Sequence, residues 1–277
     1  MDFLFDSKHW DAVSEGYKDF VGPIFENFMG GYANRLELSP SIKVLDLACG
    51  PGTASFKIHD RVGEIHGLDF SEKMISVFND KISKRKINNV KTHVGDGQDL
   101  SRFPDGSFDV VISLFGLIFF PDRVSSLKEI RRVLKPKGRL LITSWQPMMQ
   151  SSFMSCLSNA INATGCVPSP KEPRAIDVGT PDPEVFVAEF LEAGFKKPTK
   201  EAAVIEIPID DVDEFWKKNV RGSIPIHMVK EELGEEKWNE LSVKAVENLK
   251  KSLVTPCSVE LRAWVWTINL CCGYIQR

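Results

Sequence analysis

Short apolar runs alternate with amphipathic stretches through the first half of the chain. Five of these runs have the length of a strand: residues 42–48, 64–68, 90–94, 108–113 and 139–144. From Pro121 to Leu134, apolar residues recur every three or four positions, which predicts a helix packed on one face. Strands that alternate with helices predict a parallel sheet with helices on both faces.

The flanking segments carry other patterns. Aromatic and aliphatic residues at helical spacing within residues 1–34 predict one or two amphipathic helices that end at Gly30-Gly31. After residue 147 the alternation stops. It resumes with a helix at 184–193 that Gly194 caps, a sixth strand within 200–209, a helical stretch over 210–252 and a last strand within 259–270. The helical stretch cannot extend the sheet, so we expect it to cover the sheet's carboxyl edge.

Composition narrows the class of protein. The chain has 277 residues, 43% hydrophobic and 26% charged, which excludes a disordered, collagen-like or small disulfide-rich protein. The net charge of -3 offers no basic excess, so we expect no nucleic-acid partner. The longest apolar run, residues 110–120, is too short to span a bilayer, and the amino terminus has no secretory pattern. These features favour a cytoplasmic protein without a membrane span.

The cysteines do not predict a metal centre. Six are present, and none forms a Cys-x-x-Cys pair or stands near a histidine at zinc-ligand spacing. The adjacent Cys271 and Cys272 fit a soft-metal pair, but they also fit two small apolar residues at the end of the last strand. We therefore expect no metal site.

The turn after the first strand carries the most informative motif. The chain runs through Asp46 into Gly50-Pro51-Gly52, and Thr53 can cap the helix that follows. Open α/β sheets bind ligands beyond the carboxyl ends of their strands, and this turn borders that crevice. Glycines there let the backbone approach a ligand, and the helix N-terminus adds free N–H groups.

Two nucleotide-binding motifs fit this turn poorly. A dinucleotide fingerprint needs a third glycine or alanine where this chain has Ser55. The carboxylate of Asp46 would repel a pyrophosphate but would suit a cationic ligand. A phosphate-binding Walker loop is excluded, because no Gly-Lys-Ser/Thr follows.

The motif resembles the first motif of class I S-adenosylmethionine-dependent methyltransferases, acid-x-Gly-x-Gly-x-Gly. This chain reads Asp46-x-Ala48-x-Gly50-x-Gly52, with alanine in place of the first glycine. The resemblance continues in register through residues 43–145. It includes Asp69 at the end of the second strand, Gly95-Asp96-Gly97 after the third, Pro104–Asp109 before the fourth and Leu134–Gly138 before the fifth.

The resemblance implies roles for individual residues. Asp69 would bind the two ribose hydroxyls, Phe70 and Met74 would pack on adenine, and Asp96 would meet the adenine amino group. Tyr17 matches an N-terminal aromatic that helps close the cofactor site in ubiquinone- and menaquinone-type methyltransferases. The full set expected to bind the cofactor is Tyr17, Asp46, Ala48, Gly50, Gly52, Asp69, Phe70, Met74, Asp96, Gly97 and Ser113.

The resemblance also implies the architecture. We expect one α/β domain over residues 1–277, with a Rossmann-like, seven-stranded, mostly parallel sheet, helices on both faces and a helical cap. Residues 41–146 would form the cofactor-binding core and residues 1–34 an N-terminal cap segment. Residues 147–183 and 210–256 would be insertions that cap the substrate.

The expected reaction is in-line transfer of a methyl group from S-adenosylmethionine to a small-molecule acceptor. Holding donor and acceptor about 3 Å apart and aligned supplies much of the rate, and an acceptor that ionises readily needs no strong base, so the sequence identifies no definite catalytic residue. His227 is the candidate acid or base, although a lone histidine in a cap is more often packed or solvated.

The aromatic residues of the cap favour an apolar or aromatic acceptor. The residues concerned are Phe153, Phe215, Trp216, Met228 and Trp238. After the fourth strand, Phe115, Phe119 and Phe120 fit either an acceptor pocket or the packing of a loop. The other histidines considered, His59, His66 and His93, fall on helix or strand positions and are expected to be structural or exposed.

Two other functions remain open at this point. One is a non-catalytic module that binds S-adenosylmethionine or its demethylated product. The other is a nicotinamide-dependent oxidoreductase, which Asp46 and Ser55 disfavour. The sequence does not indicate the oligomeric state.

Overall fold

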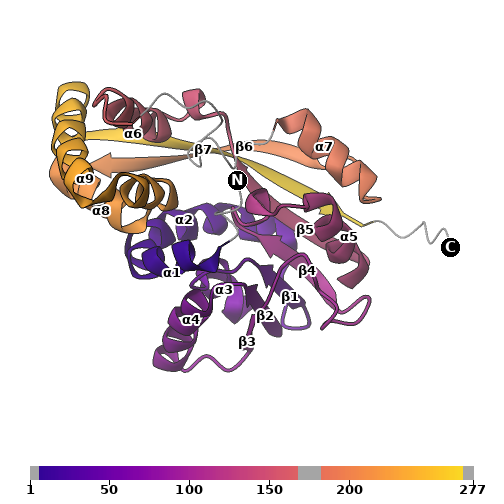
Figure 1. Cartoon of the computed structure of the whole chain (residues 1–277). Coiled ribbons are helices and arrows are strands. Elements are labelled where there is room, and N and C mark those ends of the chain that lie inside the picture. Colours follow the sequence, from indigo (N-terminus) through magenta and orange to yellow (C-terminus); the bar gives the residue numbers. More distant parts are fainter. Residues whose placement is uncertain (1–5, 168–181, 271–277) are drawn as a thin grey trace.

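The described residues of the computed structural model, 6–167 and 182–270, form one seven-stranded sheet with helices on both faces (Figure 1). The strand order is β3-β2-β1-β4-β5-β7-β6. Neighbouring strands from β3 to β5 are parallel, whereas β7 is antiparallel to both β5 and β6. This confirms the expected Rossmann-like, mostly parallel sheet.

The parallel part of the sheet follows the predicted alternation of elements. Its strands and helices are, in chain order, β1 (Lys43–Leu47), α3 (Thr53–Ile58), β2 (Glu64–Asp69), α4 (Glu72–Arg85), β3 (Val90–Val94), β4 (Phe108–Ser113), α5 (Arg123–Val133) and β5 (Leu134–Trp145). Successive residues of β1 and β4 are buried on opposite faces of the sheet, so each central strand must be apolar on both sides.

The last two strands carry the helices of the second half. They are β6 (Thr199–Ile209) and β7 (Cys257–Asn269), preceded by α6 (Ser152–Asn162) and α7 (Pro183–Glu192) and separated by α8 (Val212–Gly222) and α9 (Ile224–Ser252). Gly194, with φ of +83°, follows α7, and its N–H bonds to Leu191, which confirms the predicted cap. The expected cysteine pair 271–272 lies outside the described residues.

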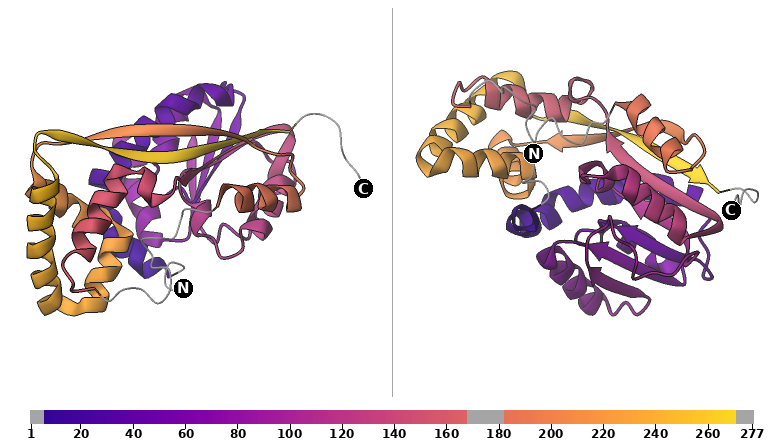
Figure 2. Two further views of the ribbon diagram at one scale, coloured as in Figure 1. Left: turned by 90° about the horizontal axis from the view of Figure 1, so that it is seen from above. Right: turned by 45° about the vertical axis from the view of Figure 1, so that its right-hand side comes forward.

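The register of β7 explains where these helices lie. Trp145, the last residue of β5, pairs with Ala263, so residues 257–262 of β7 pair with β6 and with no other described strand. This half of the β6–β7 pair projects past the carboxyl end of β5 and carries α8 and α9 at its tip, with α6 beside them (Figure 2). The helices therefore stand over the edge where the parallel strands end.

The N-terminal segment packs against that same edge. It contains α1 (Ser7–Gly16), a π-helical turn (Tyr17–Val21) and α2 (Gly22–Tyr32). The prediction that helix ends at Gly30-Gly31 was wrong, because α2 continues through both glycines. Helix α1 comes close to α8, where a Cβ on Gly16 would lie 2.0 Å from the carbonyl oxygen of Arg221. Only glycine permits this approach of the two backbones.

The turn before α3 also differs from expectation. Gly52, not Thr53, occupies the N-cap position of α3, and it has no side chain with which to cap the helix. Thr53 is the first helical residue, and its buried hydroxyl has no hydrogen-bond partner among the described residues. The left-handed conformation of Gly52 is the reason, since it turns the chain into the helix one residue earlier.

Buried His66 of β2 and half-buried His93 of β3 pack against each other. The rings of His66 and His93 are stacked with centroids 5.1 Å apart, and Nδ1 of His66 lies 2.9 Å from Nε2 of His93. The edges of Phe103 and Phe108 close around His66. This confirms a structural role for His66 and His93. Burial, followed by the charge that His66 can carry, lowers the pKa of His93 to about 4.

This histidine pair predicts a contribution to stability that is lost in acid. An unfolded histidine has a pKa of about 6.5, so His93 binds fewer protons in the folded protein than in the unfolded chain below that pH. The contribution of His93 should be constant above about pH 6.5 and fall as the pH drops towards about 4, whereas the raised pKa values of Asp46 and Asp69 act in the opposite direction. Urea unfolding followed by circular dichroism should show that His93→Gln gains stability relative to wild type as the pH falls through this range, while the difference between His59→Gln and wild type stays constant. Identical profiles for the two variants would contradict this assignment.

Candidate functional site

The turn between β1 and α3 presents its backbone to a cavity. Gly50 has φ of +52°, and a Cβ built on it would meet no atom within 4 Å. Gly52 has φ of +83°, but its Cβ would lie 2.2 Å from the ring of Phe78. Gly50 therefore faces open space, whereas Gly52 is required by packing in the core beneath the turn.

The alanine that departs from the family motif has a local compensation. Ala48 adopts φ of +53°, an unusual conformation for a residue with a side chain. Its methyl group occupies the space beside Gly116, where a Cβ would come within 2.3 Å of the Ala48 Cβ. Gly116 thus makes room for the alanine at the floor of the cavity.

Asp69 lies at the carboxyl end of β2 and organises the backbone around it. One carboxylate oxygen accepts a hydrogen bond from the N–H of Gly50 at 2.8 Å, and the other accepts from Ser71 at 3.0 Å. The residue is 7% exposed. Burial raises the pKa of Asp69 to about 6, although the backbone hydrogen bonds oppose this shift. Each oxygen keeps a lone pair that can accept a further hydrogen bond from a ligand.

Asp46 lies below the cavity rather than on its surface. It is 1% exposed and accepts hydrogen bonds from the backbone N–H and the hydroxyl of Ser55, at 3.1 and 2.6 Å. Burial raises the pKa of Asp46 to about 7, and the Asp69 carboxylate adds to the shift. Ser55, which breaks the dinucleotide fingerprint, is therefore the residue that anchors Asp46 to the start of α3.

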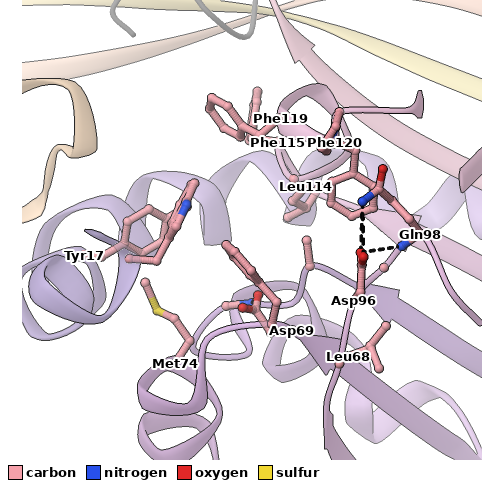
Figure 3. Close-up of a pocket in the computed structure, with 18 residues that line it drawn as sticks. Tyr17, Leu68, Asp69, Met74, Asp96, Gln98, Leu114, Phe115, Phe119 and Phe120 are labelled. Atoms are coloured by element: carbon pink, nitrogen blue, oxygen red, sulfur yellow. Dashed lines mark hydrogen bonds between the residues drawn. The ribbon is translucent and has the colours of Figure 1, made fainter. Parts of the chain in front are cut away.

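The loop after β3 forms the opposite wall. Asp96 is exposed and accepts hydrogen bonds from the backbone and the side-chain amide of Gln98 (Figure 3). The side-chain oxygen of Gln98 in turn accepts from the N–H of Asp122, which joins this loop to the start of α5. A Cβ on Gly97 would lie 2.5 Å from the ring of Phe120. Gly97 is thus fixed by its contact with Phe120.

The N-terminal helix closes the cavity from the side. Asp11 of α1 accepts hydrogen bonds from the hydroxyl of Ser71 and from the N–H of Lys73 at the start of α4. This contact brings Trp10 and Tyr17 over the cavity. Burial raises the pKa of Tyr17, and the charge of Asp69 adds to the shift. The phenol therefore stays protonated at neutral pH.

The structure brings most of the expected cofactor residues to one cavity. Eight of the eleven line it: Tyr17, Ala48, Gly50, Asp69, Phe70, Met74, Asp96 and Gly97. Asp46, Gly52 and Ser113 do not, and the hydroxyl of Ser113 accepts from the N–H of Leu117 instead. Gly95 of the Gly95-Asp96-Gly97 motif also lines the cavity, and so do several residues that were given no site role from the sequence: Trp10, Leu68, Gln98, Leu114, Gly116 and Pro121. Gln98 follows the motif acid by two positions, which is a usable sequence signal.

A second cavity adjoins the first and is almost entirely apolar. It is lined by Trp10, Tyr17, Phe20, Val21, Ile24, Phe25, Phe115, Phe119, Trp145, Phe153, Met154, Leu157, Asn219, Gly222, Ser223, Ile224, Pro225, Ile226 and Leu261. Trp10, Tyr17, Phe115 and Phe119 line both cavities. The two cavities therefore meet at these four aromatic side chains.

Phe115 holds this junction in a fixed shape. It has φ of +56°, and its N–H donates to the hydroxyl of Thr143 at 2.8 Å. Its ring stacks on Trp145 with centroids 3.7 Å apart. Strained backbone of this kind persists where surrounding contacts impose it, and it often marks a functional site. Of the three phenylalanines after β4, Phe115 and Phe119 line both cavities and Phe120 lines only the first.

Most of the cap residues named from the sequence, and His227, do not line either cavity. Trp216 and Trp238 stack on each other at 5.9 Å in the core, and Phe215 is buried against Phe153. Of the five cap residues named from the sequence, only Phe153 lines the second cavity. His227 lines neither cavity and instead approaches Glu231 on the same helix.

The strand order and the cavity over the carboxyl ends of β1, β2 and β4 define the class of protein. A seven-stranded sheet with an antiparallel β7, an acid at the end of β2 and a glycine turn after β1 are together the architecture of class I S-adenosylmethionine-dependent methyltransferases. Within the described residues, none of the helices is long and apolar enough to cross a membrane.

Comparison with known proteins gives the family. Residues 38–193 match the methyltransferase domain family. This match covers more than half of the chain, so the chain belongs to that family.

Curated relatives align with part of the chain. A demethylmenaquinone methyltransferase from Geobacillus sp. (strain WCH70) is 37% identical over 110 residues, which cover 39% of this chain and 47% of the relative. A demethylmenaquinone methyltransferase from Lactococcus lactis subsp. lactis is 34% identical over 166 residues, 56% of this chain and 66% of the relative. The chain thus spans about half to two thirds of the length of these relatives.

Solved structures share the fold over a larger part of the chain. The Bacillus subtilis YcgJ protein is 19% identical with a TM-score of 0.59, covering 88% of this chain and 98% of that one. The [4+2]-cyclase SpnF is 17% identical with a TM-score of 0.58, covering 90% and 82%. At this identity the likeness concerns the fold alone.

Proposed function

We propose that this protein transfers a methyl group from S-adenosylmethionine to a small apolar or aromatic acceptor. One observation carries the proposal: a cavity that contains Asp69 and the open face of Gly50 joins a second, apolar cavity at the rings of Tyr17 and Phe115. A charged nucleoside ligand fits the first cavity, and an apolar partner fits the second. Family membership supports the same reaction class.

The residues of the first cavity suit the adenosyl group of this donor. The two oxygens of Asp69 can accept hydrogen bonds from neighbouring ribose hydroxyls, as a carboxylate can. Phe70, Met74 and Leu68 offer apolar surface to a purine, and Asp96 offers an acceptor to its amino group. Asp69, which is mostly ionised at neutral pH, gives this end of the sheet a negative potential, which favours a cationic ligand.

The chain's own residues act by positioning and by excluding water. S-adenosylmethionine, when bound, supplies a methyl group already activated by a sulfonium. Trp10, Tyr17, Phe115 and Phe119 surround the passage between the cavities. Their aromatic faces can hold a cation by a cation–π interaction, and alignment of two reactants can supply roughly 7–11 kcal/mol of barrier reduction. Tyr17 keeps its proton and can donate a hydrogen bond to the acceptor.

The acceptor cavity indicates what kind of nucleophile it serves. Among the residues that line it, Tyr17 is the one titratable side chain, and its raised pKa keeps it from acting as a base at neutral pH. An acceptor that ionises readily by itself, or a carbon nucleophile of an electron-rich ring, fits such a cavity.

The proposed domain organisation follows the same division of roles. We assign residues 41–146 to a core that binds the cofactor, and we assign residues 1–34, 147–183 and 210–256 to a cap that covers the substrate.

The setting proposed for this reaction is the cytoplasm. The described cysteines, Cys49, Cys156, Cys166 and Cys257, are free thiols. Free thiols are typical of a reducing compartment.

A turnover experiment distinguishes the proposed methyl transfer from the alternative functions. The [4+2]-cyclase shows that this fold also serves a protein named for a different reaction. The protein should therefore be incubated with methyl-labelled S-adenosylmethionine and a panel of phenols, quinols, carboxylic acids and amines. We expect label on at least one phenol or quinol. Binding of the donor without transfer to any acceptor would favour a non-catalytic module, and binding of a nicotinamide nucleotide instead would favour an oxidoreductase.

A charged side chain in the second cavity should weaken acceptor binding and leave donor binding unchanged. Met154 lines that cavity, so Met154→Lys should raise the KM for an apolar acceptor about tenfold or more by burying a charge there. The Kd for S-adenosylhomocysteine should stay within twofold of wild type. The matched control is Met149→Lys, because Met149 is 81% exposed and lines neither cavity. Equal KM values for the two variants would show that the acceptor binds elsewhere.

A further inference from the structure

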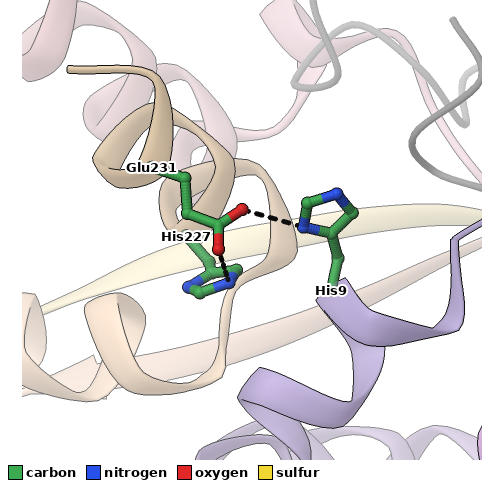
Figure 4. Close-up of side chains that lie close together, drawn as sticks. All are labelled: His9, His227 and Glu231. Atoms are coloured by element: carbon green, nitrogen blue, oxygen red, sulfur yellow. Dashed lines mark ion pairs between the residues drawn. The ribbon is translucent and has the colours of Figure 1, made fainter. Parts of the chain in front are cut away.

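Three side chains that belong to neither cavity converge between the N-terminal helix and the cap. They are His9 of α1 and His227 and Glu231 of α9 (Figure 4). Nδ1 of His9 lies 3.0 Å from one carboxylate oxygen of Glu231, and Nε2 of His227 lies 3.4 Å from the other. One ligand atom from each residue lies within 4.8 Å of the others. We propose that these residues form a binding site for a divalent transition metal ion such as Zn²⁺.

The distances suit that ion. Zn²⁺ binds imidazole nitrogen and carboxylate oxygen at about 2.0–2.2 Å, so neighbouring ligands of a tetrahedral site lie about 3.3 Å apart. The two nitrogen-to-oxygen distances, 3.0 and 3.4 Å, lie on either side of this value but run to different oxygens of Glu231, so a small rotation of the carboxylate would bring one oxygen to both nitrogens. Two imidazoles with one carboxylate favour zinc, cobalt or nickel over magnesium or calcium, which prefer oxygen ligands. The carboxylate also offsets part of the charge of the ion.

The helices hold the three ligands in place. His227 and Glu231 are four residues apart on α9, which puts both on one face of the helix. Nε2 of His227 is buried and makes no hydrogen bond with any described residue. A buried nitrogen in that state costs free energy, and a metal ion would use its lone pair. The side chain of Glu231 is 52% exposed, which leaves a route for the ion and room for water as a further ligand.

The proposed metal site lies next to residues that line the acceptor cavity. His9 precedes Trp10, which lines both cavities, and His227 follows Ile226, which lines the second. An ion bound here would fasten α1 to α9 beside the acceptor cavity. None of the three ligands lines either cavity, so the ion would act on closure of the cap and not on the methyl group. The spacing of the cysteines predicted no metal site, and this cluster has no sequence signal because His9 lies far along the chain from His227 and Glu231.

The proposal is tested by metal binding to the full chain. The protein should be stripped with a chelator, desalted and titrated with Zn²⁺ against a chromophoric competitor. We expect one ion per chain, and we expect His9→Gln, His227→Gln and Glu231→Gln each to weaken the affinity about tenfold or more. His59→Gln is the matched control and should bind as wild type does. Similar affinities for all four variants would overturn the proposal.

The absorption spectrum of bound Co²⁺ distinguishes this site from a site made of cysteines. Melting temperatures distinguish loss of the site from misfolding of a variant. Co²⁺ bound here should show visible absorption without a thiolate-to-metal charge-transfer band, and Cys271→Ser/Cys272→Ser should leave that spectrum unchanged. Zn²⁺ should raise the melting temperature of wild type and of His59→Gln but not of His227→Gln, because an ion that binds only the folded state stabilises it. A charge-transfer band, or an equal rise in melting temperature for His227→Gln, would refute the site.

Discussion

Gly50→Val should abolish measurable binding of S-adenosylmethionine and S-adenosylhomocysteine, with a loss of affinity of about 100-fold or more. Gly50 lies on the cavity, and a Cβ at this position points into open space. A valine side chain would therefore fill volume that the proposed ligand needs, while it meets no protein atom at its Cβ. Affinity should be measured by calorimetry on the purified variant.

The backbone strain of this substitution needs a matched control. Gly50 and Gly165 both have positive φ, +52° and +67°, and a Cβ on Gly165 also meets no atom within 4 Å. Valine in that region of φ costs about 1–3 kcal/mol at either site. Gly165 lines neither cavity, so Gly165→Val should lose comparable stability and keep normal affinity. If Gly50→Val binds as tightly as Gly165→Val does, the turn is not the floor of the donor site.

Asp69→Ala should weaken binding of both S-adenosyl ligands by about 10- to 150-fold, which corresponds to about 1.5–3 kcal/mol. The substitution would remove charge-assisted hydrogen bonds to the ribose and would release the N–H groups of Gly50 and Ser71 that the carboxylate now accepts from. Both effects act on the same wall of the cavity, so they add in the same direction.

Two further variants identify the source of that loss. Asp69→Asn keeps the size of the side chain but lacks the charge, and we expect it to lie between wild type and Asp69→Ala. Asp96→Ala removes an exposed acid from the same cavity and should lose less affinity than Asp69→Ala. Calorimetry gives each Kd, and urea unfolding checks that the variants fold. An Asp69→Ala protein with wild-type affinity would place the ribose elsewhere.

The sequence predicted the cofactor site best where the residues concerned lie close together along the chain. Residues 46–52 contain both the end of β1 and its turn, and the turn, the helix and the acid at the end of β2 lie near each other along the chain. The strands were also predictable, since a strand buried on both faces must be apolar throughout. Eight of the eleven expected cofactor residues line the cavity, and all but Tyr17 belong to motifs at the ends of adjacent parallel strands.

The roles of small residues were less predictable. The glycines of the turn look equivalent in the sequence, yet Gly50 faces the cavity and Gly52 faces Phe78. The alanine at position 48 looks like a weakened motif, yet Gly116 after β4 receives its methyl group. These contacts join elements that are separate in sequence. Periodicity within one element carries no information about which residue another element places against it.

The cap shows the same distinction most clearly. Its aromatic content indicated an apolar acceptor pocket, but Trp216 and Trp238 are used to hold α8 and α9 together, and Trp10 and Phe25 from the N-terminal segment line the pocket instead.

The order of residues by itself determined the class of fold, the strand-and-turn motif at residues 46–52 and the acid at position 69. These features are local, and backbone geometry with the alternation of apolar residues fixes them. Only the tertiary structure decided that α1 meets α9, that the two cavities share four aromatic side chains and that His9 stands beside His227. Those contacts depend on how far β7 projects beyond β5 and on the close approach of α1 to α8 at Gly16. Both are set by the packing of the whole chain.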